Sequence, residues 1–143
     1  MSKINLDKIA QDKAREMLEC PDKETLERLV TKALGVLQSQ GVYAMMLFLF
    51  SRTSKENETS PYIKKPLYKA LLELPQFKND SSLKGFCENN ENHGDVFKWF
   101  SDNITDNMDN LLLVRDLYEQ TLIYARFHAK AAQKETFNSG GTP

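Results

Sequence analysis

The stretch VYAMMLFLF, residues 42–50, is the strongest structural signal in the sequence, because Tyr43 carries its only polar group. A helix that is apolar on every side must be covered by other elements from several directions. We therefore expect Val42–Phe50 to be a buried central helix around which the rest of the chain packs. The stretch has about half the ~20 residues that a helix needs to cross a bilayer, so it does not indicate a membrane span.

Two amphipathic helices are predicted before this stretch. Apolar residues recur at helical spacing from Ile4 to Leu18 and again from Leu26 to Leu37. Pro21 disfavours helical backbone in the residue before it, so the first helix should end near Cys20. The second should begin at a cap offered by Asp22 or Thr25, and it should end at Gly41, since glycine is common where a helix leaves through the left-handed region.

The segment after the central helix is predicted to begin as a loop. Residues 52–60, RTSKENETS, are polar and read as an exposed, mobile connection. Pro61 should open the next unit, and apolar spacing from Tyr62 to Leu74 predicts a helix that Pro75 ends. Because proline disturbs a helix interior, the regular part of that helix should lie around and after Pro66.

The second half of the chain ends in a long helix. Residues 79–95 are rich in turn formers, with one helical turn expected at 83–87, and a short aromatic helix is expected from Val96 to Ile104. Capping residues at 106–109 precede a helix predicted over 108–135. The fold class is therefore all-α, a compact bundle of about five to six helices. One domain, 1–137, should be followed by a flexible tail, 138–143.

Composition limits the partners and the compartment. Charged residues make up 27% of the chain and nearly balance to a net charge of -1, so any surface that attracts nucleic acid must be local. Cys20 and Cys87 are far apart and form no CxxC pair, which argues against a disulfide scaffold or a zinc finger. These features, with a charged N-terminus and no apolar leader, predict a cytoplasmic protein with no membrane contact.

No pattern typical of catalysis stands out. The two histidines, His93 and His128, lie outside any recognisable motif, and no Gly-rich loop precedes a helix. We expect no enzymatic activity, no cofactor and no bound metal.

The basic residues are the candidates for binding. Arg126, Lys130 and Lys134 are four apart on the last predicted helix, so each drifts only ~40° from the one before and the three share one face. Such a stripe can contact RNA phosphates, or it can simply be a solvated helix face. The other candidate RNA-binding residues lie after the central helix: Arg52, Lys55, Lys64 and Lys65.

Two segments carry a family resemblance. Leu34 to Phe50, LGVLQSQGVYAMMLFLF, and Tyr118 to Ala132, YEQTLIYARFHAKAA, resemble the small helical subunit of the type III-B CRISPR effector, the Cmr complex. The family has a second helix that leads through an Asn-Gly-Leu turn into an apolar central helix, and a last helix with a Tyr, a Trp and a Lys-Arg pair. Here Phe127 stands in place of the Trp, and Ala129-Lys130 in place of Lys-Arg.

The resemblance implies a non-catalytic subunit in antiviral defence. Such a subunit stacks with copies of itself along the crRNA-bearing backbone, beside other effector subunits, and contacts single-stranded target RNA. Guide pairing reads the sequence, and the protein need only hold phosphates and shape. Two alternatives stay open: the small subunit of the type III-A complex, and a helical adaptor or regulator that binds a protein partner and no RNA.

Overall fold

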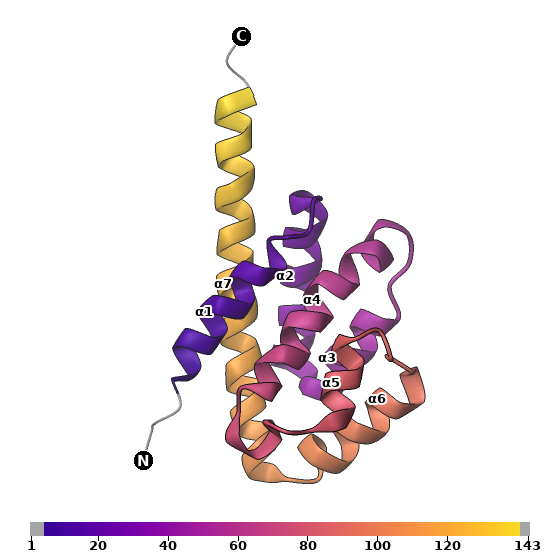
Figure 1. The fold of residues 1–143 in the computed structure, drawn as a ribbon. Helices are drawn as coiled ribbons and strands as arrows, with labels where there is room; N and C mark the ends of the chain where they lie inside the picture. The colour runs from indigo at the N-terminus through magenta and orange to yellow at the C-terminus, as the bar shows by residue number, and fades with distance from the viewer. Residues whose placement is uncertain (1–4, 141–143) are drawn as a thin grey trace.

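The computed structural model describes the backbone from Asn5 to Gly140 and the side chains as far as Glu135. The regular secondary structure in this part of the chain is all helical, and the fold is compact (Figure 1). Its elements are α1 (Leu6–Met17), α2 (Lys23–Gln40), α3 (Val42–Phe50), α4 (Ser54–Leu72), the 3-10 turn η1 (Pro75–Phe77), α5 (Ser81–Cys87), α6 (His93–Phe100), the π-helical turn η2 (Ser101–Thr105) and α7 (Met108–Gly140). The all-α class is confirmed, whereas the count of five to six helices is not.

Side-chain caps set where several helices begin. Asp22 accepts a hydrogen bond from the Thr25 amide, as predicted, and satisfies a donor that the first turn of α2 would otherwise leave free. The same device, with an Asn or Asp oxygen bonded to the amide three residues on, precedes α1, α5 and α6; the capping residues are Asn5, Asp80 and Asn92. Gly41 ends α2 with a φ of 97°.

The long helix α7 packs along α1 and α2. It runs antiparallel to α2, because Arg115 donates to the Gln38 carbonyl at one end and Gln133 donates to the Glu27 carboxylate at the other, over 2.9 and 2.7 Å. The C-terminal end of α7 projects beyond the body of the bundle (Figure 1). Helix is assigned as far as Gly140, into the predicted tail, and residues 141–143 lie outside the described part.

The prediction that α3 is covered on every side is wrong, and its central position in the bundle is not confirmed. The buried side of this helix carries Val42, Met45, Met46 and Leu49, Phe48 and Phe50 are partly buried against the core, and the helix packs against α2, α4, α6 and α7. On the other side, Tyr43 is 38% and Leu47 41% exposed. The apolar composition of α3 does not show which of its sides the rest of the chain covers. Within the described chain, the interface between α2 and α7 is larger than the interface between α2 and α3.

The predicted loop at 52–60 is mostly helix, which corrects the sequence interpretation. The first helical turns of α4 are formed by residues 54–60, and Pro61 and Pro66 lie inside the helix. Tertiary contacts outweigh the polar composition: the buried Ser60 hydroxyl donates to the Leu49 carbonyl over 2.8 Å. Each proline removes one amide, which frees the carbonyl four residues earlier, at Asn57 and Tyr62, and both of these residues are exposed.

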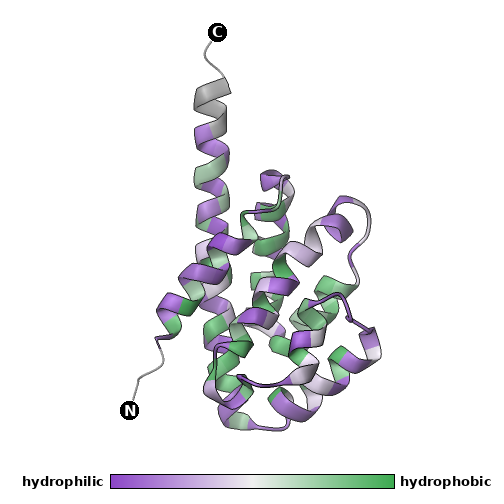
Figure 2. Cartoon of the chain, viewed as in Figure 1, coloured by the Kyte–Doolittle hydropathy of each residue, from purple (hydrophilic) through white to green (hydrophobic). Residues whose placement is uncertain are grey.

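The last third of the bundle follows the prediction closely. The helical turn at 83–87 is α5, and the aromatic segment is α6 followed by η2. Trp99 packs its ring against Phe77 and Phe100 and donates its indole N–H to Asp80 over 3.0 Å. Each of these elements contributes apolar residues to one buried core, and Figure 2 shows the hydrophobic residues along their ribbons. Among the helices in the described residues, none combines the length and apolar character that crossing a membrane requires.

Candidate nucleic-acid interface

The predicted stripe on α7 lies on the outward side of the helix. Lys130 and Lys134 are exposed and Arg126 is half-buried, whereas the core-facing side carries Ala125 and Ala129. None of the three cations has a hydrogen bond or ion pair to any residue described in the structure, and the Arg126 Nε is buried without an acceptor. The three charges are therefore uncompensated within the described residues.

Neighbouring contacts fix the orientation of this stripe. Tyr124 donates its hydroxyl to Asp7 of α1, and this hydrogen bond raises the pKa of the Tyr124 phenol. Gln133 binds the Glu27 carboxylate of α2. These bonds hold two sides of α7 against α1 and α2, so the third side, with Lys130 and Lys134, faces solvent. Phe127 lies beside the stripe and is 62% exposed.

Arg52 is engaged within the fold. Its Nε donates to the Phe48 carbonyl over 2.9 Å, its guanidinium carbon lies 3.8 Å from the centroid of the Phe48 ring, and its Nη1 lies 3.3 Å from Glu56. The sequence pattern did not identify two further cations at this position. Arg28 and Lys32 of α2 approach the same Glu56 carboxylate at 3.8 and 2.8 Å.

The environment of Glu56 explains why these cations gather. The hydrogen bond from Lys32 lowers the pKa of Glu56, burial opposes that shift, and Arg52 adds to it. The i, i+4 spacing of Arg28 and Lys32 on α2 was the available signal, since such residues share a helix face. Lys55 is exposed nearby, where its charge contributes to lowering the pKa of Asp22 after the two hydrogen bonds from Thr25.

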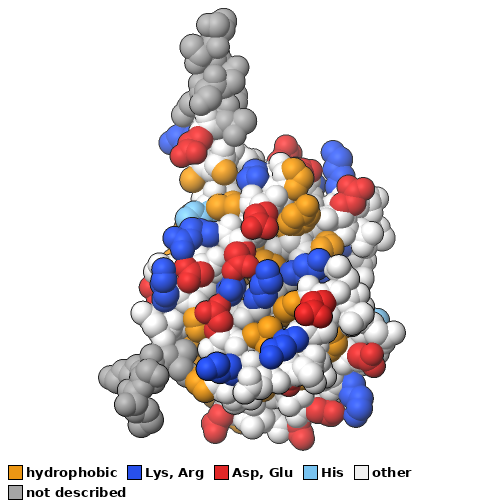
Figure 3. Space-filling view, in the orientation of Figure 1, with side chains coloured by type: hydrophobic (Ala, Val, Ile, Leu, Met, Phe, Trp, Pro, Cys, Tyr) orange, Lys and Arg blue, Asp and Glu red, His pale blue; other side chains and the backbone are white. Residues whose placement is uncertain are grey.

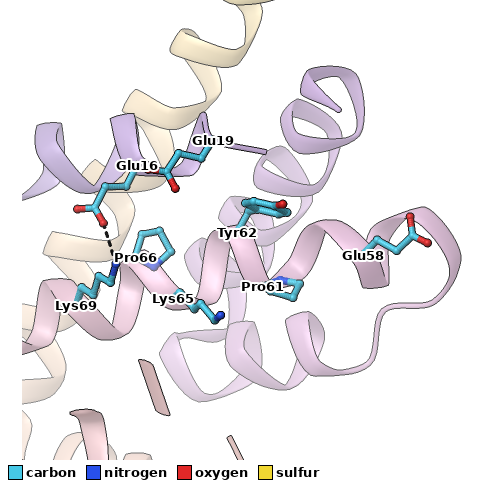
Figure 4. Close-up of a pocket in the computed structure, with 8 residues that line it drawn as sticks. All are labelled: Glu16, Glu19, Glu58, Pro61, Tyr62, Lys65, Pro66 and Lys69. Carbon is cyan, nitrogen blue, oxygen red and sulfur yellow. Dashed lines mark hydrogen bonds and ion pairs between the residues drawn. The ribbon is translucent and has the colours of Figure 1, made fainter. Parts of the chain in front are cut away.

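The adjacent residues Lys64 and Lys65 lie in different environments. Lys64 is buried: its Nζ lies 2.7 Å from the Glu91 carboxylate and 3.8 Å from the centroid of the Phe50 ring. Lys65 is half-exposed and lines a groove of about 430 Å³ between α1 and α4 (Figure 4). The two side chains therefore cannot act on one ligand surface.

The groove beside Lys65 has mixed charge. Pro61, Tyr62 and Pro66 of α4 line it, and Glu16 of α1 is paired with Lys69 over 3.5 Å (Figure 4). Positive and negative side chains are interspersed over this face of the molecule (Figure 3). A face of this kind presents no continuous cationic track for a phosphate backbone.

The histidines and cysteines are placed apart from one another. The His93 ring packs against Phe97, with 4.9 Å between the ring centroids, and His128 is exposed on α7. Cys20 is buried and Cys87 half-buried, and burial raises the pKa of the Cys87 thiol. In the part of the chain that the structure describes, no three potential ligands converge as a metal site would require.

The structure therefore divides the seven predicted contact residues into separate groups. Arg126, Lys130 and Lys134 form one outward stripe on α7, while Arg52 and Lys55 lie at the junction of α2, α3 and α4. Comparison of the chain with protein-family profiles, with curated protein sequences and with solved structures finds no match.

Proposed function

We propose that this chain is a non-catalytic small subunit of a type III CRISPR effector complex, of the type III-B class, and that it acts in the cytoplasm. In this role it stacks along the crRNA-bearing backbone and contacts single-stranded target RNA. The resemblance of residues 34–50 and 118–132 motivates the proposal, and the all-helical fold is compatible with it. The observation that carries the RNA contact is the uncompensated stripe of Arg126, Lys130 and Lys134 on α7.

The stripe is suited to phosphates and not to base recognition. Successive cations four residues apart on a helix lie ~6 Å from one another along the axis, close to the spacing of phosphates in an extended strand. Lysine binds phosphate as a flexible point charge and carries no sequence information. Sequence selection is then left to guide pairing, and this subunit contributes non-specific affinity that salt weakens.

A triple change of Arg126, Lys130 and Lys134 to Ala tests the proposal. The variant chain is assembled with the other effector subunits and guide RNA, and target RNA binding is measured across a salt series. Loss of three phosphate contacts should weaken binding and reduce the slope of log affinity against log salt by about two units on a single strand. Circular dichroism of the free chain confirms that α7 still forms.

A matched variant controls for net charge. Lys78, Lys84 and Lys98 are exposed on other elements, and their change to Ala removes the same number of positive charges. This second triple variant should keep the parental slope. Equal slopes for the parent and both variants would show that the α7 stripe is only a solvated face. Failure of the parent chain to assemble with type III subunits would refute the wider proposal.

A second candidate function, a protein-binding adaptor, is favoured by one observation. The outer side of α3 leaves Leu47 41% and Tyr43 38% exposed, although the Tyr43 ring also packs against Phe97. A chain that binds protein and no RNA would show no salt-dependent affinity for single-stranded RNA, so the same salt series separates the two candidates.

A further inference from the structure

The outer side of α3 is an unpartnered apolar helix face. Tyr43 is 38% and Leu47 41% exposed, and Phe48 is half-buried beside them. Tyr43 and Leu47 are four residues apart and share one face of the helix, whereas Phe48 lies about 100° round the helix from Leu47, at the edge of that face. We define the α3 outer face by these three residues.

Packing within the chain does not require the α3 outer face to be apolar. The buried side of α3 already supplies four core residues, and a polar side chain at Leu47, the most exposed residue of the outer face, would leave that packing unchanged. Single exposed apolar residues are ordinary, but here a whole helix has no charged residue on either side. An exposed apolar position on a helix without charged residues is a candidate point of contact with another molecule.

The α3 outer face has a cationic edge. Arg52 lies over the Phe48 ring at 3.8 Å, and through Glu56 it is joined to Arg28 and Lys32 of α2. Three cations thus approach one carboxylate that is 15% exposed, with Glu24 reaching Arg28 only at 4.0 Å. The contacts of Glu56 hold these cations next to an apolar helix face, and they leave an excess of positive charge there.

The chemistry of the face favours a protein partner over a nucleic acid. Base stacking needs free aromatic faces. The Phe48 ring is covered by Arg52, and the Tyr43 ring packs edge-on against Phe97, with 5.1 Å between the ring centroids. The most exposed member, Leu47, has no ring to stack. An apolar helix face with a charged edge suits packing against the apolar side of another helix, with opposite charges along its flank.

We propose that the α3 outer face binds an amphipathic helix of a partner protein, with its apolar side on Tyr43 and Leu47 and acidic side chains opposite Arg28, Lys32 and Arg52. The occupant is argued from charge complementarity: carboxylates on the flank of the bound helix would meet the cationic edge. This interface is separate from the α7 stripe, so the inference goes beyond the proposed function and does not depend on RNA binding.

Synthetic helical peptides test this interface on the full chain. The first probe carries Leu at positions i, i+3, i+4 and i+7 with Glu on the flanks, and the second carries Lys in place of every Glu. Binding is measured by fluorescence anisotropy of the labelled peptides and mapped by NMR chemical-shift changes. We expect the acidic peptide to bind at least tenfold more tightly than the basic one, with weaker binding at higher salt and shifts at Tyr43, Leu47 and Lys32.

Two variants locate the binding. Leu47→Glu should lower affinity for the acidic peptide at least tenfold, because it places a carboxylate at the centre of the face. Leu112→Glu changes a leucine that is 54% exposed on α7 and should leave the affinity unchanged. The triple change on α7 should also leave peptide binding unchanged, so the outcome is independent of the RNA experiment.

Several results would overturn the proposal. Equal affinity for the two peptides would remove the argument from charge, and unchanged affinity in Leu47→Glu would place the contact elsewhere. Single-stranded oligouridine shifting the same residues would assign the face to nucleic acid. Sedimentation showing self-association that Leu47→Glu abolishes would assign it to a second copy of this chain.

Discussion

Lys64 and Glu91 form an ion pair within the bundle, with the lysine Nζ 2.7 Å from the carboxylate and 3.8 Å from the centroid of the Phe50 ring. The Lys64 side chain is 9% and the Glu91 side chain 21% exposed. The pair ties α4 to the segment between α5 and α6, and it gives a residue predicted to contact RNA a structural role in the isolated chain.

Removal of the Lys64 charge should destabilise the fold. Lys64→Met keeps much of the stem but leaves Glu91 without its donor, which should lower the free energy of unfolding by about 2 kcal/mol. Lys98→Met breaks the exposed pair with Asp102 and should cost less than about 0.5 kcal/mol. Urea denaturation measures both, and equal losses would contradict the internal role of Lys64.

The two glycines of the α2 region should respond in opposite directions. Gly41 has a φ of 97° and a ψ of -175°, a conformation nearly restricted to glycine, so Gly41→Ala should cost about 1–3 kcal/mol. Gly35 lies inside α2, and a Cβ there would meet nothing within 4 Å. Gly35→Ala should therefore stabilise the chain by up to about 1 kcal/mol. Thermal melts compare the two, and a stabilising Gly41→Ala would refute the assigned turn.

Two buried tyrosines allow the contribution of one side-chain hydrogen bond to the free energy of unfolding to be measured. The Tyr118 hydroxyl donates to the Leu67 carbonyl over 3.2 Å, whereas the buried Tyr68 hydroxyl lies near the Glu91 carboxylate without a hydrogen bond of good geometry. Tyr118→Phe should cost about 1 kcal/mol, and Tyr68→Phe should be neutral or slightly stabilising. The difference between the two midpoints in urea is the readout. The same loss in both variants would mean that the Tyr68 hydroxyl is also bonded.

Substitutions at two adjacent positions of α3 should distinguish its buried side from its exposed side. Met46 is fully buried, so Met46→Asp places an unpaired carboxylate in the core, and its cost of several kcal/mol should unfold much of the population. Leu47→Asp lies on the α3 outer face and should change stability by less than about 0.5 kcal/mol. Circular dichroism during heating distinguishes them. A stable Met46→Asp protein would show that the helix is rotated relative to this description.

Stability should fall in acid through Glu56. Its pKa in the folded chain lies below the ordinary value of 4.5, because Lys32 and Arg52 favour the charged form. A lowered pKa means that the unfolded chain binds the proton more readily. The stability that the charged Glu56 carboxylate adds is therefore complete above about pH 4.5, and it is lost as pH falls through the pKa of Glu56 in the folded chain. Glu56→Gln should flatten that dependence in urea titrations at successive pH values, whereas Glu58→Gln, an exposed carboxylate on the same helix, should not.

The sequence predicted helices well wherever local signals and burial agreed. Apolar spacing and caps placed α1, α2, α5, α6 and α7 close to their observed bounds. The start of α4 was missed because its stabilising contacts are distant in sequence, such as the Ser60 hydroxyl on the Leu49 carbonyl. The exposed side of α3 was missed because composition cannot show which side of an apolar helix the rest of the chain leaves open.

The sequence predicted which basic residues share a face of the last helix, but it did not predict which basic residues form ion pairs within the fold. The four-residue spacing correctly placed Lys130 and Lys134 on one face of α7. The burial of Lys64 depends on Glu91, 27 residues away, and the gathering of Arg28, Lys32 and Arg52 depends on one carboxylate. Neighbours from distant segments decide whether a cation is free to bind a ligand.

The prolines within α4 also bear on the order in which the bundle assembles. Pro61 and Pro66 withhold two amides from the helix ladder, so a peptide of residues 54–72 should be largely unstructured alone. Helix α7, with no proline from 108 to 140, can begin to form before it docks. Nucleation would then start where α2 meets α7, and α4 would join late, as its neighbours supply the contacts that its own backbone lacks.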